Sequence, residues 1–185
     1  MENKIILVSG YCATGKSTFT RKLSELLKIP CFIKDNIKEK LGDGFGPDNN
    51  MVMNKGSIVT FMLMLYIVEN ILNTGNICIL ESNFKGKEIE ELKTLLEKYN
   101  CKCLTFIFKA DFDIIIKRYK ERNILGQRHW VHYSSHEYNK DDFEKGHKKS
   151  KTGEKGIGKI IVTDTTSFEK VNYEKLFDIA KEFIK

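Results

Sequence analysis

The stretch SGYCATGKST, residues 9–18, places two glycines, a lysine and four serine or threonine hydroxyls in one short segment. Its core, from Gly10 to Ser17, fits the pattern G-x-x-x-x-G-K-[ST]. Glycines allow a turn in which successive backbone N–H groups face phosphate oxygens, the lysine reaches the β- and γ-phosphates, and the final hydroxyl can ligate Mg²⁺. The residues expected to bind nucleotide phosphates are therefore Gly10, Tyr11, Cys12, Ala13, Thr14, Gly15, Lys16, Ser17 and Thr18.

The sequence on either side of this segment has the context that the motif requires. Residues 4–9 (KIILVS) form an apolar run typical of a strand buried on both faces. Residues 16–28 carry apolar side chains at helical spacing, and Pro30 ends that segment. A helix that starts near Lys16 brings its positive end to the phosphates, and Lys16 itself is a catalytic candidate.

Length and composition indicate one domain and leave its partner open. The 185 residues suffice for a single domain, 1–185, with a sizeable core. The net charge of +6 favours anionic partners without choosing among nucleotides, phosphorylated metabolites and nucleic acid. Five cysteines without framework spacing favour free thiols in a reducing compartment. The longest apolar stretch, 58–68, is shorter than the roughly 20 residues that cross a bilayer, so we expect a buried helix and a cytoplasmic protein with no membrane partner.

Strand-like and helix-like segments alternate along the chain. Strands are expected at 4–9, 31–34, 76–83, 101–108 and 159–163, and helices at 16–28, from 35–36 onward, 54–73, 86–98, 111–123 and 169–184. The helix after the second strand is expected to begin with a capping box between Asn36 and Glu39. Residues 41–50 and 144–159 are expected to be loops, the second one mobile. Repeated β-α units predict an α/β fold with a parallel sheet and helices on both faces.

Two carboxylates are expected at the carboxyl ends of strands, where open parallel sheets bind their ligands. Asp35 follows the segment CFIK (31–34). It would accept a proton from an attacking hydroxyl or cap the next helix, and the sequence weighs these two roles evenly. Glu81 ends the segment ICILE (77–81). With Ser17 it is a candidate for holding Mg²⁺, and an ordinary polar strand end is the alternative.

Three arginines are candidates for stabilising a transferring phosphoryl group. Arg118 and Arg122 lie four residues apart on one face of a predicted helix, and Arg128 follows in GQRHW (126–130). A solvated basic face is the alternative to this catalytic role. After Arg128, the aromatic residues Trp130, Tyr133 and Tyr138 lie among His129, His132 and His136. These aromatics would stack on a base or a flat substrate, or pack a lid against the body.

Together these pieces resemble the small P-loop kinases of the polynucleotide-kinase-like and zeta-toxin-like group, which are related to shikimate- and gluconate-type kinases. The resemblance rests on ILVSGYCATGKST (6–18), KDNIKE (34–39), ILESNF (79–84), IKRYKERN (116–123) and IVTDTT (161–166). It implies a P-loop NTPase fold, three-layer α/β/α with a five-stranded parallel sheet and a small helical lid at about 118–140. It also implies ATP with Mg²⁺ and phosphoryl transfer to a hydroxyl.

The resemblance implies roles for single residues as well. Asp35 would be the base or the acceptor anchor, Arg118 and Arg122 would serve the lid, and Arg122 would also contact the nucleotide. The loop that contains Asp164 and Thr165 would flank adenine. The group often has an arginine three residues after the aspartate, where this chain has Lys38, and lysine offers a point charge in place of a bidentate fork.

We therefore expect a kinase that moves the γ-phosphoryl group of Mg-ATP to a hydroxyl of a small molecule or of a nucleic-acid 5′ end, without an obligate protein partner. The alternative is a nucleotide-dependent switch or ATPase module that has no phosphoryl acceptor. A guanine-specific switch would have N-K-x-D after the fourth strand, and FKAD (108–111) does not supply it. A third possibility is nucleic-acid binding through the lysines between 145 and 159. Glu154 interrupts this run of positive charge.

Overall fold

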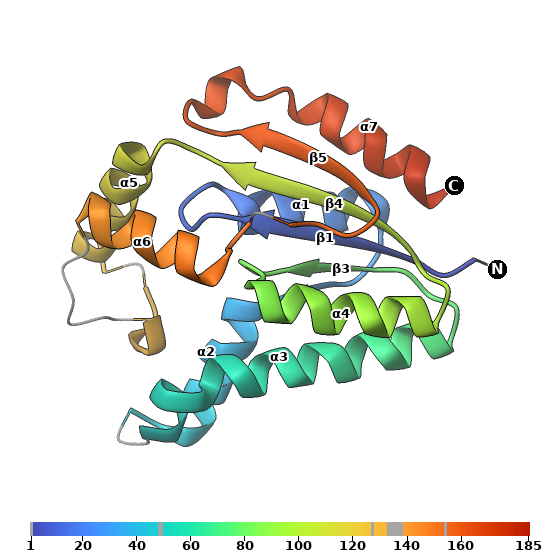
Figure 1. Ribbon diagram of the computed structural model, residues 1–185, viewed down its shortest axis with the longest axis horizontal. Coiled ribbons are helices and arrows are strands. Elements are labelled where there is room, and N and C mark those ends of the chain that lie inside the picture. Colours follow the sequence, from blue (N-terminus) through green and yellow to red (C-terminus); the bar gives the residue numbers. More distant parts are fainter. Residues whose placement is uncertain (1, 48–49, 127, 133–138, 154) are drawn as a thin grey trace.

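A five-stranded parallel sheet forms the middle layer of the computed structural model, which describes residues 2–47, 50–126, 128–132, 139–153 and 155–185 (Figure 1). The strands lie in the order β2-β3-β1-β4-β5, and every pairing is parallel. Their bounds are β1 (Lys4–Gly10), β2 (Cys31–Ile33), β3 (Cys78–Glu81), β4 (Lys102–Lys109) and β5 (Lys159–Asp164). The predicted α/β class and the five parallel strands are confirmed.

Strand β1 lies at the centre of the sheet and is buried on both faces. Four successive side chains, Ile5, Ile6, Leu7 and Val8, have no exposed surface. Because side chains alternate across a strand, Ile5 and Leu7 enter the core on one face of the sheet, and Ile6 and Val8 enter the core on the other. This double burial is the reason that residues 4–9 read as a continuous apolar run.

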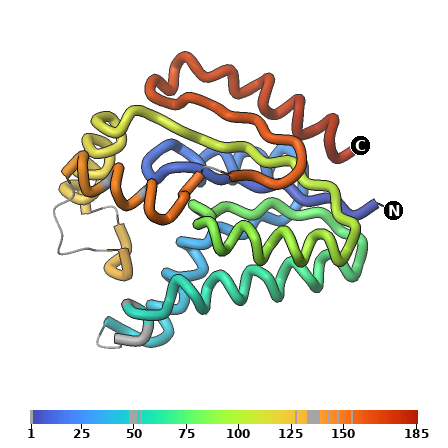
Figure 2. Tube along the Cα trace, in the orientation of Figure 1, coloured from blue at the N-terminus to red at the C-terminus, as the bar shows by residue number. Residues whose placement is uncertain are grey.

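Helices cover both faces of the sheet and gather at one end of it (Figures 1 and 2). One face packs against α1 (Lys16–Leu27) and α7 (Tyr173–Ile184), and the other packs against α3 (Asn50–Asn73) and α4 (Gly86–Lys98). Three helices lie toward the carboxyl ends of the strands, namely α2 (Lys34–Phe45), α5 (Phe112–Ile124) and α6 (Lys140–Ser150). Two short 3-10 helices cover Trp130–His132 and Phe168–Lys170.

Three expectations about local structure are wrong. Helix α2 begins at Lys34, its N-cap is Ile33 and no side chain caps it, so the capping box between Asn36 and Glu39 does not form. The same helix runs on to Phe45, so much of 41–50 is helical rather than loop. Likewise, α6 occupies residues up to 150 of the segment expected to be a mobile loop from 144. In α2, packing of Val131, Trp130 and His129 at Gly42 outweighs the low helix propensity of glycine.

Helix α3 has one buried face and one exposed face, whereas the sequence predicted a helix buried overall. Phe61, Met64, Val68 and Leu72 are at most 5% exposed and belong to the core. The segment Asn54–Asn73 is long and apolar enough to cross a membrane by length and composition alone. A single helix of this kind is weak evidence for a membrane span, and 33% of its most apolar window is buried inside the protein.

An aromatic group joins α1 to the sheet and to α7. The ring of Phe19, 1% exposed, stacks on Phe177 at 5.3 Å between ring centroids and lies 5.2 Å and 5.0 Å from the rings of Phe106 and Phe108. Because α1 follows the phosphate-loop segment directly, this contact fixes the position of that helix over the sheet.

We predict that Phe19→Ala destabilises the protein by about 3–5 kcal/mol, because the substitution removes a buried ring and leaves a cavity. Denaturant unfolding measures the loss of free energy. Leu26→Ala is the control on the same helix, since Leu26 is 45% exposed, and it should change the free energy of unfolding far less. Equal losses for the two variants would contradict the prediction.

Candidate functional site

The loop between β1 and α1 has the backbone of a phosphate cradle. Gly10 (φ 123°) and Gly15 (φ 83°) both occupy conformations that favour glycine, and Gly15 is the N-cap of α1. A side chain at Gly10 would overlap the carbonyl oxygen of Phe108 in the neighbouring strand. That same oxygen accepts a hydrogen bond from the N–H of Tyr11 at 3.0 Å. The loop therefore leaves the sheet at a fixed point and opens onto the amino end of α1, where an anion is favoured.

Lys16 and Thr14 are held inside this loop. The Lys16 ammonium donates a hydrogen bond to the carbonyl oxygen of Tyr11 at 2.6 Å, and the Thr14 hydroxyl donates to the same oxygen at 2.7 Å. Both side chains are buried, with Lys16 only 6% exposed. A buried ammonium close to several loop N–H groups makes this place strongly attractive to phosphate oxygens.

Ser17 and Glu81 meet at the floor of the site. The Ser17 hydroxyl donates a hydrogen bond of 2.7 Å to Oε2 of Glu81, and Oε1 of the same carboxylate lies 4.0 Å from the Lys16 ammonium. Burial raises the pKa of the Glu81 carboxyl, while Lys16 and the bond from Ser17 lower it. A hydroxyl and a carboxylate are oxygen donors of the kind that Mg²⁺ prefers, so the two predicted metal ligands fit a magnesium ion held together with nucleotide phosphates.

A polar cavity of about 760 Å³ lies in front of the loop. The predicted residues that line it are Cys12, Ala13, Thr14, Gly15, Lys16, Ser17, Thr18, Asp35, Glu81, Arg122 and Arg128. They come from the phosphate loop, from the start of α2, from the end of β3 and from α5 with the segment after it. The topology thus brings together groups that are far apart in the sequence, as expected at the carboxyl ends of parallel strands.

Helix α2 supplies one wall of this cavity. Asp35 stands in its first turn and faces the cavity without capping the helix, so the structure gives no support to the capping role. One turn later Lys38 and Glu39 also line the cavity. Burial lowers the pKa of the Lys38 ammonium, and three cations, Lys34, Arg128 and Lys85, lower it further, whereas Asp35 raises it.

The segment His129–His132 is fastened to the same helix, and we call this contact the α2 latch. Lys38 donates a hydrogen bond to the carbonyl oxygen of Val131 at 2.9 Å. Nε2 of His132 lies 3.1 Å from Glu39 and Nε2 of His129 lies 2.9 Å from Asp43. Gly42 has no side chain where Val131, Trp130 and His129 press against α2. The latch thereby holds the segment next to Arg128 on the wall that carries Asp35.

The pKa of the His132 imidazole is lowered in this setting, which favours its neutral form. Burial lowers the pKa of its imidazole, and the neighbouring cations Lys38 and Arg128 act in the same direction, against Asp35 and Glu39. The two described histidines of the segment each contact a carboxylate. Among the residues that the structure describes, no group of three or more His, Cys, Asp and Glu side chains is placed to hold a metal ion. His136 lies outside the described residues.

Arg118 lies apart from the phosphate cavity. Its guanidinium donates hydrogen bonds to the carbonyl oxygens of Thr165 (2.9 Å), Thr166 (3.0 Å) and Ala13 (3.5 Å), and it stacks 3.8 Å from the centre of the Phe168 ring. This arginine connects α5 to the phosphate loop and to the segment after β5. Arg122, one turn further along α5, does line the cavity.

The predicted base-flanking residues lie beside that arginine. The hydroxyl and N–H of Thr165 both donate to the carbonyl oxygen of Lys109, at 3.0 Å and 2.7 Å. Asp164 accepts a hydrogen bond from the N–H of Thr166 at 2.8 Å, which lowers the pKa of its carboxyl. Together these bonds fix the path of the chain from β5 to α7.

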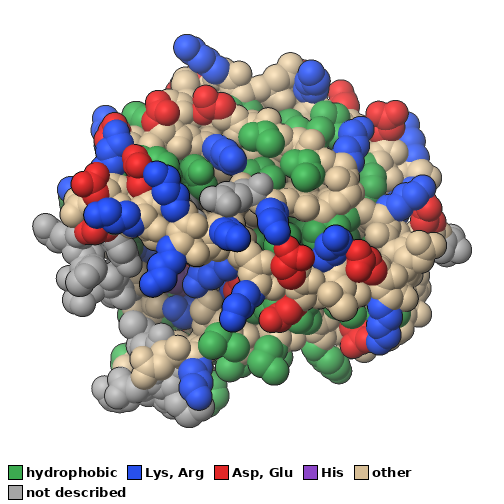
Figure 3. All heavy atoms as spheres, in the orientation of Figure 1, with side chains coloured by type: hydrophobic (Ala, Val, Ile, Leu, Met, Phe, Trp, Pro, Cys, Tyr) green, Lys and Arg blue, Asp and Glu red, His purple; other side chains and the backbone are tan. Residues whose placement is uncertain are grey.

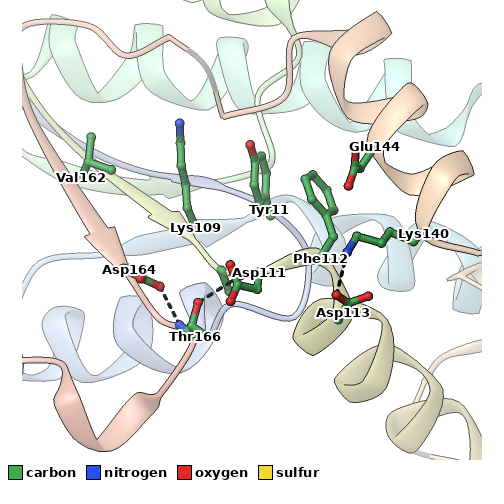
Figure 4. Close-up of a pocket in the computed structure, with 11 residues that line it drawn as sticks. Tyr11, Lys109, Asp111, Phe112, Asp113, Lys140, Glu144, Val162, Asp164 and Thr166 are labelled. Carbon is green, nitrogen blue, oxygen red and sulfur yellow. Dashed lines mark hydrogen bonds and ion pairs between the residues drawn. The ribbon is translucent and has the colours of Figure 1, made fainter.

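The side chain of Tyr11 points away from the phosphate cavity. It stacks on Phe112 at 5.2 Å and borders a second cavity of about 480 Å³ at the ends of β4 and β5 (Figure 4). Lys109 projects beside Tyr11, and Asp113 pairs with Lys140 of α6 across this cavity. Tyr11 therefore contributes its backbone, and not its side chain, to the phosphate loop.

Several residues that line the cavity were not among the predicted catalytic, nucleotide-binding or metal-binding residues, and Arg21, Glu39 and Lys85 are the charged examples discussed next. Arg21 stands four residues after Ser17 on α1, so helical spacing alone places the two side chains on one face. Glu39 follows Asp35 by the same interval, although its spacing from Asn36 predicted a capping role. Lys85 follows the end of β3 by four residues and carried no comparable signal.

Comparison with known proteins gives structural likeness only. No protein-family model and no curated protein sequence matches the chain. A provisionally assigned kinase from Chloroflexus aurantiacus J-10-fl superposes with a TM-score of 0.86 at 24% sequence identity, with 100% of both chains covered. A gluconokinase from Sinorhizobium meliloti 1021 superposes with a TM-score of 0.60 at 11% identity, covering 97% of this chain and 93% of that one.

A shikimate kinase from Bacteroides thetaiotaomicron superposes with a TM-score of 0.57 at 14% identity, covering 97% of each chain. The fold is therefore that of the small P-loop kinases. The narrower likeness to the polynucleotide-kinase-like and zeta-toxin-like group stays a prediction from the sequence.

We predict that Gly42→Ala loosens the α2 latch, because the added methyl group would overlap Val131 and crowd Trp130 and His129. Trp130 is the only tryptophan in the sequence, so its fluorescence reports on the latch directly. The emission maximum should move to longer wavelength. Gly44→Ala is the matched control on the same helix, since nothing lies within 4 Å of its added methyl group. Identical emission spectra for the two variants would contradict the described packing.

Proposed function

We propose that this protein is a Mg-ATP-dependent kinase that phosphorylates a hydroxyl group of a small acidic molecule. The observation that carries the proposal is the position of Asp35 in the same cavity as the phosphate loop and the Ser17–Glu81 pair. A phosphate cradle alone fits a switch or an ATPase equally well. A carboxylate across the cavity adds the group that an attacking hydroxyl needs.

The residues of the cavity divide the reaction among them. The loop N–H groups and Lys16 bind the phosphates of ATP, and Ser17 and Glu81 would hold magnesium, which neutralises phosphate charge when bound. The acceptor hydroxyl attacks the γ-phosphorus, its proton passes to the Asp35 carboxylate and ADP leaves. Arg122 and Arg128 face the same space and stabilise the charge on the transferring group.

The charge of the cavity supports an acidic acceptor. Besides Lys16, Arg122 and Glu81, the cavity lining includes four cations (Arg21, Lys38, Lys85 and Arg128) and two acids, Asp35 and Glu39. Glu39 is already paired with His132. Burial, and then repulsion from neighbouring cations, lowers the pKa of Lys38, and a carboxylate or phosphate on the acceptor would offset that repulsion.

Asp35→Asn tests the proposed base. We expect kcat to fall by about 10²–10⁴-fold, the usual contribution of a positioned general base, while the affinity for Mg-ATP stays unchanged. Steady-state kinetics and calorimetric titration with the nucleotide measure the two effects. Glu25→Gln is the control, because Glu25 is an exposed carboxylate of α1 outside the cavity. Undiminished turnover of Asp35→Asn would remove Asp35 from the mechanism.

A panel of matched acceptors tests the substrate class. Each pair joins an acidic compound to its uncharged counterpart, such as a sugar acid with the sugar and a nucleotide with the nucleoside, and a 5′-hydroxyl oligonucleotide is added. Mass spectrometry after incubation with Mg-ATP should show one phosphoryl group gained by the acidic member. Its kcat/KM should be about 10- to 100-fold higher, since hydrogen bonds to charged groups contribute about 1.5–3 kcal/mol.

Preference for a neutral member would contradict the acidic acceptor while leaving the kinase proposal intact. ATP hydrolysis with no acceptor modified would favour the switch or ATPase alternative instead.

A further inference from the structure

The exposed face of α3 carries a row of large apolar side chains. Ile58, Met62 and Tyr66 lie one helical turn apart and are 62%, 63% and 65% exposed. Val59 and Leu63, 40% and 37% exposed, widen the row. Figure 3 shows hydrophobic side chains along the lower edge of the molecule, where α3 runs in Figure 1. An apolar patch of this continuity on a soluble protein marks a surface that another surface covers.

The two ends of the row carry opposite charges. Lys55 is exposed at the amino end, and Glu69 closes the carboxyl end. The Glu69 carboxylate is held in place by Lys98 (2.8 Å) and the hydroxyl of Tyr99 (2.9 Å). Both donors contact the same oxygen, Oε1.

We propose that this face binds the same face of a second copy of the chain, with the two α3 helices antiparallel about a two-fold axis at Met62. Lys55 and Glu69 lie seven residues before and after Met62, so this symmetry places Lys55 opposite Glu69 of the partner subunit. Ile58 then packs against Tyr66 of the partner subunit. A parallel arrangement would place like charges side by side at both ends of the row, which is unfavourable.

A second copy fits this face better than a lipid bilayer does. The row from Ile58 to Tyr66 covers about 12 Å of helix at 1.5 Å per residue, whereas the hydrocarbon layer is about 30 Å thick. The opposite face of α3 is already packed into the core, and charged or amide side chains limit the row at each end. The pairing does not depend on the proposed phosphotransfer.

The mass of the protein in solution tests the pairing. At micromolar concentration the wild-type chain should sediment at twice its mass of 21.4 kDa. Met62→Lys places two ammonium groups together at the axis and should sediment at 21.4 kDa, with Mg-ATP binding unchanged. Leu26→Lys, an exposed apolar position on α1, is the control and should remain a dimer.

Cross-linking tests the antiparallel arrangement. Met62→Cys places two thiols at the axis, so oxidation should give a covalent dimer above the background of the wild-type cysteines. Asn73→Cys is the control, because in the antiparallel pair its two copies lie about 33 Å apart along the helices, whereas in a parallel pair they would be neighbours.

The proposal is overturned if the wild-type chain sediments at 21.4 kDa, or if Met62→Lys still sediments at twice that mass. Cross-linking through Asn73→Cys in place of Met62→Cys would overturn the arrangement. Flotation of the wild-type monomer with phosphatidylcholine vesicles would assign the face to a membrane surface and would overturn the proposal as well.

Discussion

The absence of a side chain at Gly10 is the constraint on which the site depends. At this residue the chain runs so close to the Phe108 carbonyl that any β-carbon would overlap it, and the next N–H donates a hydrogen bond to that same oxygen. The loop can therefore turn away from the sheet at once and present its N–H groups to one point. From there α1 begins at Lys16, and Ser17 reaches Glu81 at the end of β3. A bulkier residue at this position would displace the whole arrangement.

Helix α2 connects the candidate base, Asp35, to the segment that follows Arg128. Its first turn presents Asp35 to the cavity, and its second presents Lys38 and Glu39. The second turn and the last turn both contact the segment that follows Arg128. The segment His129–His132 is thus held by the same helix that carries the candidate base. Preorganisation of this kind matters for phosphoryl transfer, where positioning and charge stabilisation supply nearly all of the catalysis.

Features with a local sequence signal could be predicted, and features that depend on distant contacts could not. Residue spacing predicts the phosphate loop, and a continuous apolar run predicts the buried strand β1. The parallel sheet follows from the alternation of strands and helices. Helix α2 continues past Gly42, where Val131, a residue distant in the sequence, packs against it. Composition alone predicted a loop there. Lys85 enters the cavity because β3 ends where it does, which no motif encodes.

The pairing of β1 has a consequence for how the chain folds. Ile5 lies beside Cys78 on one side and beside Cys103 on the other, so the central strand, although made first, has no neighbour until much later parts of the chain exist. Its four apolar side chains stay unpaired in the growing chain until β3 and β4 have been made, and pairing with these strands closes long loops. Parallel sheets of this kind fold slowly and pass through states with exposed apolar strands. Synthesis of this protein therefore includes a period in which its most buried segment is its most vulnerable to aggregation.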